Sequence, residues 1–115
     1  IVRGTTSRYL VDMIREANPY EVHFLVSSPP ITHPCFYGMD FPDPDELIAN
    51  KFNSDTQAIA DEIGVNSLRY LSADGLVSAV KDANPSPYSY CTACFTGNYP
   101  VPVDFTVEKE ENEIV

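Results

Sequence analysis

The spacing of the prolines is the feature that most constrains how this chain can fold. Five of the ten prolines lie between Ser27 and Pro44, a density that excludes an α-helix or a central β-strand there. The Asn18-Pro19 pair and the Asn84-Pro85-Ser86-Pro87 run are stop signals for two helices. We therefore expect a long structured loop over residues 27–44, and loops of this length often carry function.

The stretch before this loop has the pattern of half a βαβ unit. Residues 2–7 predict a loop that enters a helix, in which apolar residues recur at one-turn spacing: Leu10, Met13, Ile14 and Ala17. Residues 21–26 follow as a nearly continuous apolar strand, which is typical of a parallel sheet covered on both faces. Loop, helix and strand in this order indicate the second half of a βαβ unit.

Helical patterns resume after the proline-rich loop. We predict helices over residues 44–50 and 54–63. Ser54 and Gln57 have the spacing of a capping box at the start of the second helix, and Gly64 supplies its stop.

The remainder of the chain contains one more strand and one more helix. Residues 67–71 predict a short strand, and Ser72 is placed to cap a helix that ends before the prolines at 85 and 87. Residues 88–102 are aromatic and contain proline, so we predict an irregular segment there.

The net charge of the chain indicates which partners it can bind. Seven Lys and Arg against 17 Asp and Glu give a net charge of −10, which opposes binding to nucleic acid. Residues 104–115 carry five acidic residues and one lysine, a local net charge of −4, and predict a solvated, flexible tail. There is no apolar run of membrane-spanning length, no signal-peptide pattern and no initiator Met, so we expect a soluble, cytoplasmic piece of a longer chain.

The Gly4-Thr5-Thr6-Ser7 run is chemically suited to binding phosphate. Glycine lets the backbone approach an anion, the hydroxyls donate hydrogen bonds, and the start of a helix adds a positive partial charge. Arg3 adds a charged donor. The alternative from these residues alone is an ordinary helix cap, because Thr and Ser are common at that position.

The three cysteines favour metal or redox chemistry over disulfide staples. Cys91 and Cys94 form a C-x-x-C pair that can bind one metal, and Cys35 lies beside Pro34 in a separate irregular loop that can present a third sulfur. Three ligands are one fewer than a closed zinc site or a cluster requires. Unligated thiols and a C-x-x-C disulfide remain alternatives, whereas a thioredoxin-type pair fits poorly because this pair does not follow a core strand. The two imidazoles, His23 and His33, are interpreted as structural.

Several motifs together resemble one family, the glutamine phosphoribosylpyrophosphate amidotransferases of the iron–sulfur type. The residues that carry the resemblance are Ile1-Val2-Arg3-Gly4-Thr5-Thr6, Glu21-Val22-His23, Ser27-Ser28-Pro29-Pro30-Ile31, His33-Pro34-Cys35-Phe36-Tyr37-Gly38, Glu46-Leu47-Ile48-Ala49, Ser67-Leu68 with Tyr70-Leu71-Ser72, and Tyr90-Cys91-Thr92-Ala93-Cys94-Phe95-Thr96-Gly97. Each motif alone is weak, but their order and spacing together are specific.

The resemblance implies a fold and a division of the chain. The expected fold class is α/β: the C-terminal part of a type I phosphoribosyltransferase domain, with a Rossmann-like parallel sheet, followed by a helical and irregular segment. Residues 1–30 would end the βαβ core and include the phosphate loop. Residues 31–103 would complete the domain with the cysteine loop, the helices and the C-x-x-C segment. Residues 104–115 would form the acidic tail.

The resemblance also implies a reaction and its ligands. Enzymes of this family make 5-phosphoribosylamine from phosphoribosylpyrophosphate and glutamine, the first committed step of purine biosynthesis, and purine nucleotides inhibit them at the phosphoribosyl site. Arg3, Gly4, Thr5 and Thr6 would hold the 5-phosphate. The acidic pair that contacts the ribose hydroxyls and magnesium would precede Ile1, as would the glutaminase domain that supplies ammonia, and the parent would be a homo-oligomer.

By the same resemblance, Cys35, Cys91 and Cys94 would be three of the four ligands of a [4Fe-4S] cluster, with the fourth upstream. We expect the 115-residue chain alone to be catalytically inactive. Two other classes remain open: a non-catalytic purine-nucleotide-binding module, and a structural metal-binding module in which phosphate has no role.

Overall fold

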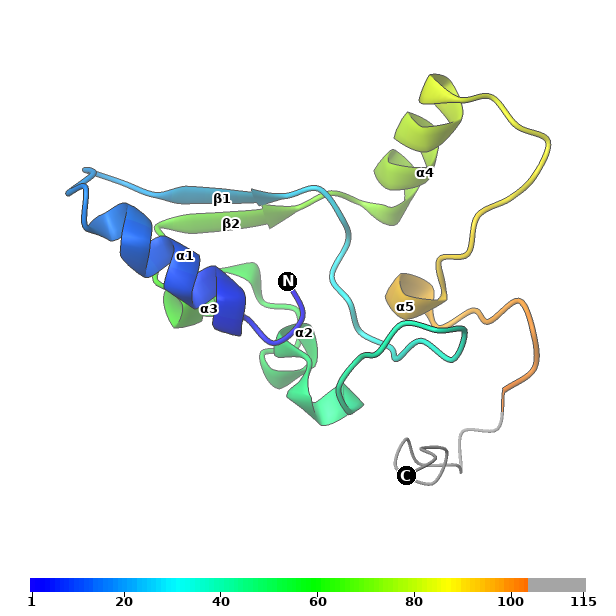
Figure 1. Ribbon diagram of the computed structural model, residues 1–115, viewed down its shortest axis with the longest axis horizontal. Coiled ribbons are helices and arrows are strands. Elements are labelled where there is room, and N and C mark those ends of the chain that lie inside the picture. Colours follow the sequence, from blue (N-terminus) through cyan, green and yellow to red (C-terminus); the bar gives the residue numbers. More distant parts are fainter. Residues whose placement is uncertain (104–115) are drawn as a thin grey trace.

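The computed structural model describes residues 1–103, and the expected acidic tail lies outside the described residues. Within them the chain forms a small α/β unit in which α1, α2 and α3 lie on one side of a two-stranded sheet and α4 lies beyond its end (Figure 1). In chain order the elements are α1 (Thr5–Arg15), β1 (His23–Val26), the 3₁₀ helix η1 (Pro44–Glu46), α2 (Ile48–Lys51), α3 (Thr56–Ile63), β2 (Ser67–Tyr70), α4 (Ala73–Ala83) and α5 (Ala93–Thr96).

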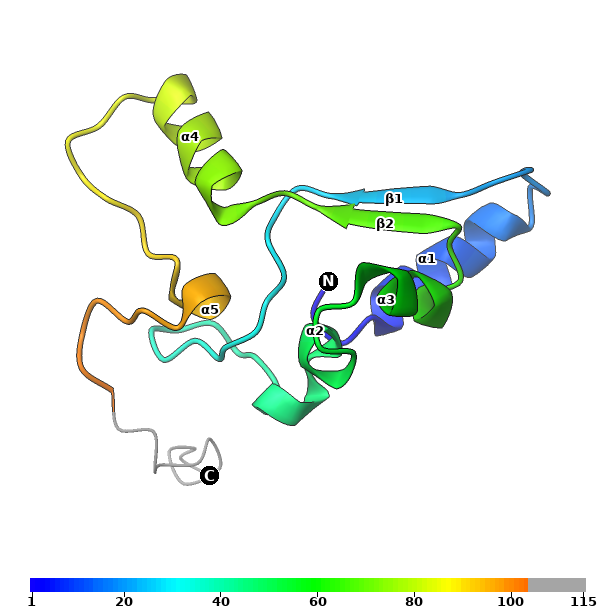
Figure 2. The ribbon, with the colours of Figure 1, turned by 180° about the vertical axis from the view of Figure 1, so that it is seen from behind.

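The two strands pair in parallel, as predicted, but within residues 1–103 β1 is not covered on both faces: its burial alternates, and Leu25 is 78% exposed. The register places His23 opposite Ser67 and Val26 opposite Tyr70. β1 is two residues shorter than predicted, because the N–H of Val22 donates to the side chain of Asn66 and not to a strand partner. α1 runs back antiparallel to β1, so the helix begins toward the end of the sheet where both strands finish (Figures 1 and 2).

The core lies between α1, α3 and the sheet. Its buried residues are Val11, Val22, Ile48, Ile59, Ala60, Ile63, Val65 and Leu68. At about 25 cal/mol per Å² of apolar surface removed from water, this cluster is the main stabilising term of the described residues. It fixes α1 at the side of the sheet and thereby sets where the loop of residues 1–4 lies.

The buried face of α1 differs from the predicted one. Leu10, Met13 and Ile14 are 46%, 68% and 40% exposed, while Val11 is 1% exposed. The buried stripe of α1 lies about one residue away from the predicted stripe. The helix is oriented by its close approach to α2 and α3, and a glycine at the start of the helix allows that approach. The members of the buried stripe, which recur every three to four residues, are Gly4, Ser7, Val11 and Arg15.

Two of the predicted helix starts are corrected. Asp55, not Ser54, is the N-cap of α3, since its carboxylate accepts from the N–H groups of Gln57 and Ala58. Ser54 has a left-handed φ of 59° and belongs to the turn after α2. The predicted helix over residues 44–50 is divided into η1 and α2, because Leu47 is extended, with ψ 125°, and fully buried.

The carboxyl-terminal third is more open. The cap at Ser72 is confirmed, because its hydroxyl accepts from the N–H of Gly75 at the start of α4. α4 has no buried residue and projects from the sheet in both views (Figures 1 and 2). Residues 88–102 are not wholly irregular, since α5 forms one helical turn that ends at Gly97 in the left-handed conformation. No helix in residues 1–103 is long and apolar enough to cross a membrane.

Candidate functional site

The phosphate-type loop is built around Gly4. This residue is the N-cap of α1, has a φ of 88°, and supplies no side chain to cap the helix. A Cβ atom at this position would lie 2.7 Å from Cδ1 of Ile48, so glycine lets the loop lie this close to α2 without moving that side chain and suits the left-handed φ. The N–H of Ile48 donates to the carbonyl of Val2 at 2.8 Å and holds the loop in place.

The start of α1 therefore presents unpaired donors. The first intrahelical hydrogen bond runs from the N–H of Arg8 to the carbonyl of Gly4, so the N–H groups of Thr5, Thr6 and Ser7 precede it. Within residues 1–103 the hydroxyls of Thr5 and Thr6 make no hydrogen bond to protein, and both residues are exposed. The cap interpretation is wrong for these hydroxyls, since the capping position belongs to Gly4.

A cavity of about 620 Å³ adjoins this helix start. Its lining comes from two segments, residues 1–7 and Asp40-Phe41-Pro42. The first segment contains Arg3 and the start of α1, and the second contains an acidic and an aromatic residue. Such a cavity suits an anion attached to a larger organic group. The sequence did not point to residues 40–42, which lie within the proline-rich loop.

Arg3 lies at the cavity with its guanidinium near Glu46. Its Nη2 is 3.6 Å from Oε2 of Glu46, and both side chains are about half exposed. The same carboxylate accepts from the N–H of Asp43 at 3.2 Å, as part of the capping box of η1. An exposed pair of this kind contributes little to stability, so the guanidinium can exchange Glu46 for a phosphate oxygen.

The three cysteines lie on two segments that pack together. The N–H groups of Thr32 and His33 both donate to the carbonyl of Cys94, at 3.0 and 3.1 Å, and join the Cys35 loop to α5. All three thiols are free. Burial raises the pKa of the Cys94 thiol, and its neighbours Cys35 and Cys91 raise it further, while a backbone hydrogen bond partly offsets these effects. The structure therefore joins the Cys35 loop to α5 through backbone hydrogen bonds, and the shared metal site of the three cysteines stays a prediction.

The metal-ligating side chains present indicate which metal group they could bind. In residues 1–103, no three His, Cys, Asp or Glu side chains converge to hold one metal ion. A cubane cluster binds each of its thiolates through a different iron, so its cysteines surround the cluster and need not meet at a single point. Thiolates are soft ligands that suit either an iron–sulfur cluster or zinc, and a fourth ligand would have to complete either site. Within residues 1–103 no carboxylates assemble a magnesium site, and we derive no step through that ion.

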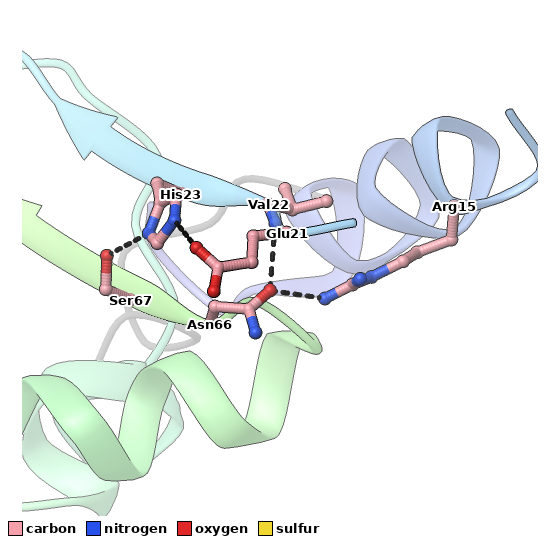
Figure 3. A network of polar contacts seen from close by, with 6 residues as sticks. All are labelled: Arg15, Glu21, Val22, His23, Asn66 and Ser67. Carbon is pink, nitrogen blue, oxygen red and sulfur yellow. Dashed lines mark hydrogen bonds and ion pairs between the residues drawn. The ribbon is translucent and has the colours of Figure 1, made fainter. Parts of the chain in front are cut away.

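His23 belongs to a polar network at the opposite end of the sheet from the loop (Figure 3). Its Nε2 lies 2.8 Å from Oε2 of Glu21 and its Nδ1 lies 2.7 Å from Oγ of Ser67. Beside it, Oδ1 of Asn66 accepts from the N–H of Val22 and from Arg15, at 2.8 and 2.9 Å. The network joins the end of α1 to the starts of both strands.

Comparison with known proteins identifies relatives of this chain. It is 45% identical over 111 residues to an amidophosphoribosyltransferase of Synechococcus elongatus and 48% identical over 104 residues to that of Bacillus subtilis. These matches include 96% and 90% of this chain but 22% and 21% of the relatives, so the chain spans about a fifth of their length. No family model matches the sequence.

Two solved structures resemble the fold. The glutamine phosphoribosylpyrophosphate amidotransferase of B. subtilis, solved with ADP and GMP, superposes with a TM-score of 0.80 at 43% identity, covering 98% of this chain and 25% of that one. A structure described as the allosteric regulatory enzyme of purine biosynthesis gives a TM-score of 0.76 at 46% identity, covering 91% of this chain and 22% of that one. These neighbours confirm the α/β class predicted from the sequence.

Proposed function

Because the chain belongs to the amidophosphoribosyltransferase family, we propose that it supplies the 5-phosphate loop and three cluster cysteines of an enzyme that makes 5-phosphoribosylamine. The substrates would be phosphoribosylpyrophosphate and glutamine. A glutaminase domain outside this chain would release the ammonia, and the complete enzyme would be a homo-oligomer. The proposal keeps the division of the chain into residues 1–30, 31–103 and 104–115.

The observation that carries the phosphate assignment is the uncapped start of α1. Its N-cap is a glycine without a capping side chain, and the hydroxyls of Thr5 and Thr6 make no hydrogen bond within the described residues. Free N–H groups at the start of an eleven-residue helix favour an anion. A 5-phosphate bound there would accept from the N–H groups and the two hydroxyls, with Arg3 as a charged donor.

The loop's contribution to the reaction is positioning. Displacement of pyrophosphate from C1 of the sugar by ammonia requires that C1 stay in line with the nucleophile, and a tethered 5-phosphate supplies that constraint. Magnesium, when bound, would stabilise the charge on the departing pyrophosphate. The residues present here bind and orient the substrate, so the chain alone should have no synthetase or glutaminase activity.

Purine nucleotides are a second class of ligand for the same loop. The related B. subtilis enzyme was solved with ADP and GMP, and a nucleoside monophosphate carries the same 5-phosphate as the sugar substrate. Their binding without turnover would favour the alternative of a non-catalytic nucleotide-binding module for the isolated chain.

The proposed role of Cys35, Cys91 and Cys94 is structural. A [4Fe-4S] cluster held by them would tie the proline-rich loop to α5, since amine transfer to a sugar requires no electron transfer. The support is the joining of the two segments through the carbonyl of Cys94 and the proximity of the three thiols. The fourth ligand would come from outside this chain.

Calorimetric titration with ribose 5-phosphate tests the phosphate assignment. Replacing Thr5 and Thr6 by Ala removes two hydroxyl donors to a charged oxygen, each worth roughly 1.5–3 kcal/mol, so the affinity should fall at least about tenfold. Thr56→Ala is the matched control, because Thr56 also begins a helix but the carboxylate of Asp55 caps that helix. Equal affinities for the double variant and the control would contradict the assignment.

Metal analysis separates the cluster from the structural-zinc alternative. We expect anaerobic reconstitution of the longer parent enzyme with iron and sulfide to give broad visible absorbance that Cys91→Ser abolishes. Because three cysteines leave one iron to an outside ligand, the isolated chain should hold a partial cluster or none. Stoichiometric zinc binding without iron incorporation would contradict the cluster assignment and leave the phosphate loop unaffected.

A further inference from the structure

The segment around Tyr99 packs against the loop that carries Cys35. Tyr99 follows α5 by three residues and is partly buried. Its hydroxyl donates to the carbonyl oxygen of Pro34 at 2.6 Å, the shortest bond between the two segments. That carbonyl belongs to the peptide unit whose nitrogen is that of Cys35, so the hydroxyl restrains the orientation of the cysteine backbone.

The ring of Tyr99 is itself held in place. It makes edge contacts with Phe36 and Tyr37, with ring centroids 5.4 and 6.1 Å apart. Tyr37 in turn donates its hydroxyl to the carbonyl of Val101 at 2.8 Å and accepts from the N–H of Val101 at 3.2 Å. The C-terminal segment is therefore fixed to the loop on both sides of Tyr99.

Cys35 is restrained from several directions. The N–H of Tyr37 lies 3.3 Å from its Sγ and favours one orientation of the thiol. On the amino side of Cys35, Thr32 and His33 donate to the carbonyl of Cys94. His33 is also packed against Gly97, where an added Cβ would lie 2.8 Å from its Nε2. Protein contacts alone thus bring the two cysteine segments together.

We propose that Tyr99 is a positioning residue for the cysteine set, whose hydroxyl holds the Pro34–Cys35 peptide in the orientation that presents Cys35 to Cys94. The inference rests on the proposed function of the cysteines, and it adds that hydrogen bonds within the chain hold the Cys35 loop against α5 without a metal.

The test measures thiol proximity without metal. In a Cys91→Ser background only Cys35 and Cys94 remain, and a short bifunctional alkylating reagent either links them, each thiolate displacing one leaving group, or modifies them singly. Mass spectrometry gives the ratio of linked to singly modified chain. Tyr99→Phe should lower this ratio by about three- to tenfold, the size expected for the loss of one hydrogen bond.

Two controls isolate the effect. Tyr88→Phe removes a hydroxyl from a tyrosine that is 78% exposed, and it should leave the ratio unchanged. In a Cys35→Ser background, linkage of Cys91 to Cys94 depends on the local conformation of residues 91–94 and should be insensitive to Tyr99→Phe. A loss of linkage in both backgrounds would indicate general unfolding and overturn the proposal, as would an unchanged Cys35–Cys94 ratio.

Cluster reconstitution distinguishes this proposal from the cofactor assignment. The iron content and visible absorbance of Tyr99→Phe should fall relative to those of Tyr88→Phe at equal iron and sulfide. Failure of every variant to take up iron, with the linkage ratio still lowered by Tyr99→Phe, would support the positioning role, since three cysteines leave one iron without a ligand from this chain. Normal iron uptake with an unchanged ratio would contradict the positioning role and support the cluster.

Discussion

At two positions of this chain, the backbone conformation explains why the residue is glycine. Gly4 and Gly64 both have a φ of 88°, a conformation that costs an L-residue roughly 1–2 kcal/mol. They differ in their surroundings, because an added Cβ at Gly4 would lie 2.7 Å from Ile48, while at Gly64 the nearest atom is 3.7 Å away on Val11. Comparing substitutions at these two glycines therefore separates the cost of the left-handed backbone conformation from the cost of close approach between elements.

We therefore predict that Gly4→Ala destabilises the chain more than Gly64→Ala does. Gly64→Ala should lower the free energy of unfolding by about 1 kcal/mol, the cost of the left-handed conformation alone. Gly4→Ala should lower it by about 2–4 kcal/mol, since it adds overpacking against α2. Urea unfolding followed by circular dichroism measures both values, and equal losses would contradict the close approach at Gly4.

Tyr70 gives a residue-scale prediction with a defined pH dependence. Its hydroxyl is buried and has no hydrogen-bond partner within the described residues, and burial raises the pKa of Tyr70 above 10.0. Removing an unsatisfied hydroxyl by Tyr70→Phe should raise the free energy of unfolding by about 1 kcal/mol at neutral pH.

The sign of the pH effect follows from proton binding. Above pH 10 the unfolded chain loses the phenolic proton while the folded chain retains it, so the native tyrosine loses stability as the pH rises further. The advantage of Tyr70→Phe should therefore grow above pH 10. A difference between the two chains that is constant from pH 8 to 11 would refute the burial of the hydroxyl.

The helices of this fold depend on contacts that local sequence patterns predict only in part. The spacing of Ser54 and Gln57 satisfied the capping-box pattern, yet Asp55 caps α3 because residues 53 and 54 both turn with positive φ after α2. The cap at Ser72 was predicted correctly because it depends only on neighbouring residues, and no adjacent side chain replaces Ser72 as the cap. The inward face of α1 was predicted one residue away, since it is set by the approach of α2 and α3 and not by the helix's own pattern.

Exchanging the two capping candidates tests this account of α3. Asp55→Ala removes the acceptor for the N–H groups of Gln57 and Ala58 and should lower the free energy of unfolding by about 1 kcal/mol, within the usual range for a lost cap. Ser54→Ala should change it by less than about 0.5 kcal/mol, as expected for a substitution that removes no structural contact. A larger effect of Ser54→Ala than of Asp55→Ala in thermal unfolding would restore the original capping box.

At the scale of the whole molecule, the two candidate sites lie on different parts of the fold. The proposed phosphate loop lies at the start of α1, whereas the cysteines lie where residues 31–38 meet α5 (Figure 1). The proposal for the loop needs only four consecutive residues, and the C-x-x-C pair is an equally local pattern. The cavity lining at residues 40–42 and the contact of Tyr99 with Pro34 were not predictable, because each joins segments whose approach depends on the complete fold.

Backbone amide NMR during a titration with ribose 5-phosphate tests the central claim most directly. The account predicts saturable shifts at the N–H groups of Thr5, Thr6 and Ser7, because these donors precede the first intrahelical bond of α1. The start of α4 is the internal control, since the hydroxyl of Ser72 already accepts from Gly75 there, and its amides should not move. Shifts of equal size at both helix starts, or none at α1, would contradict the assignment of a phosphate site to this loop.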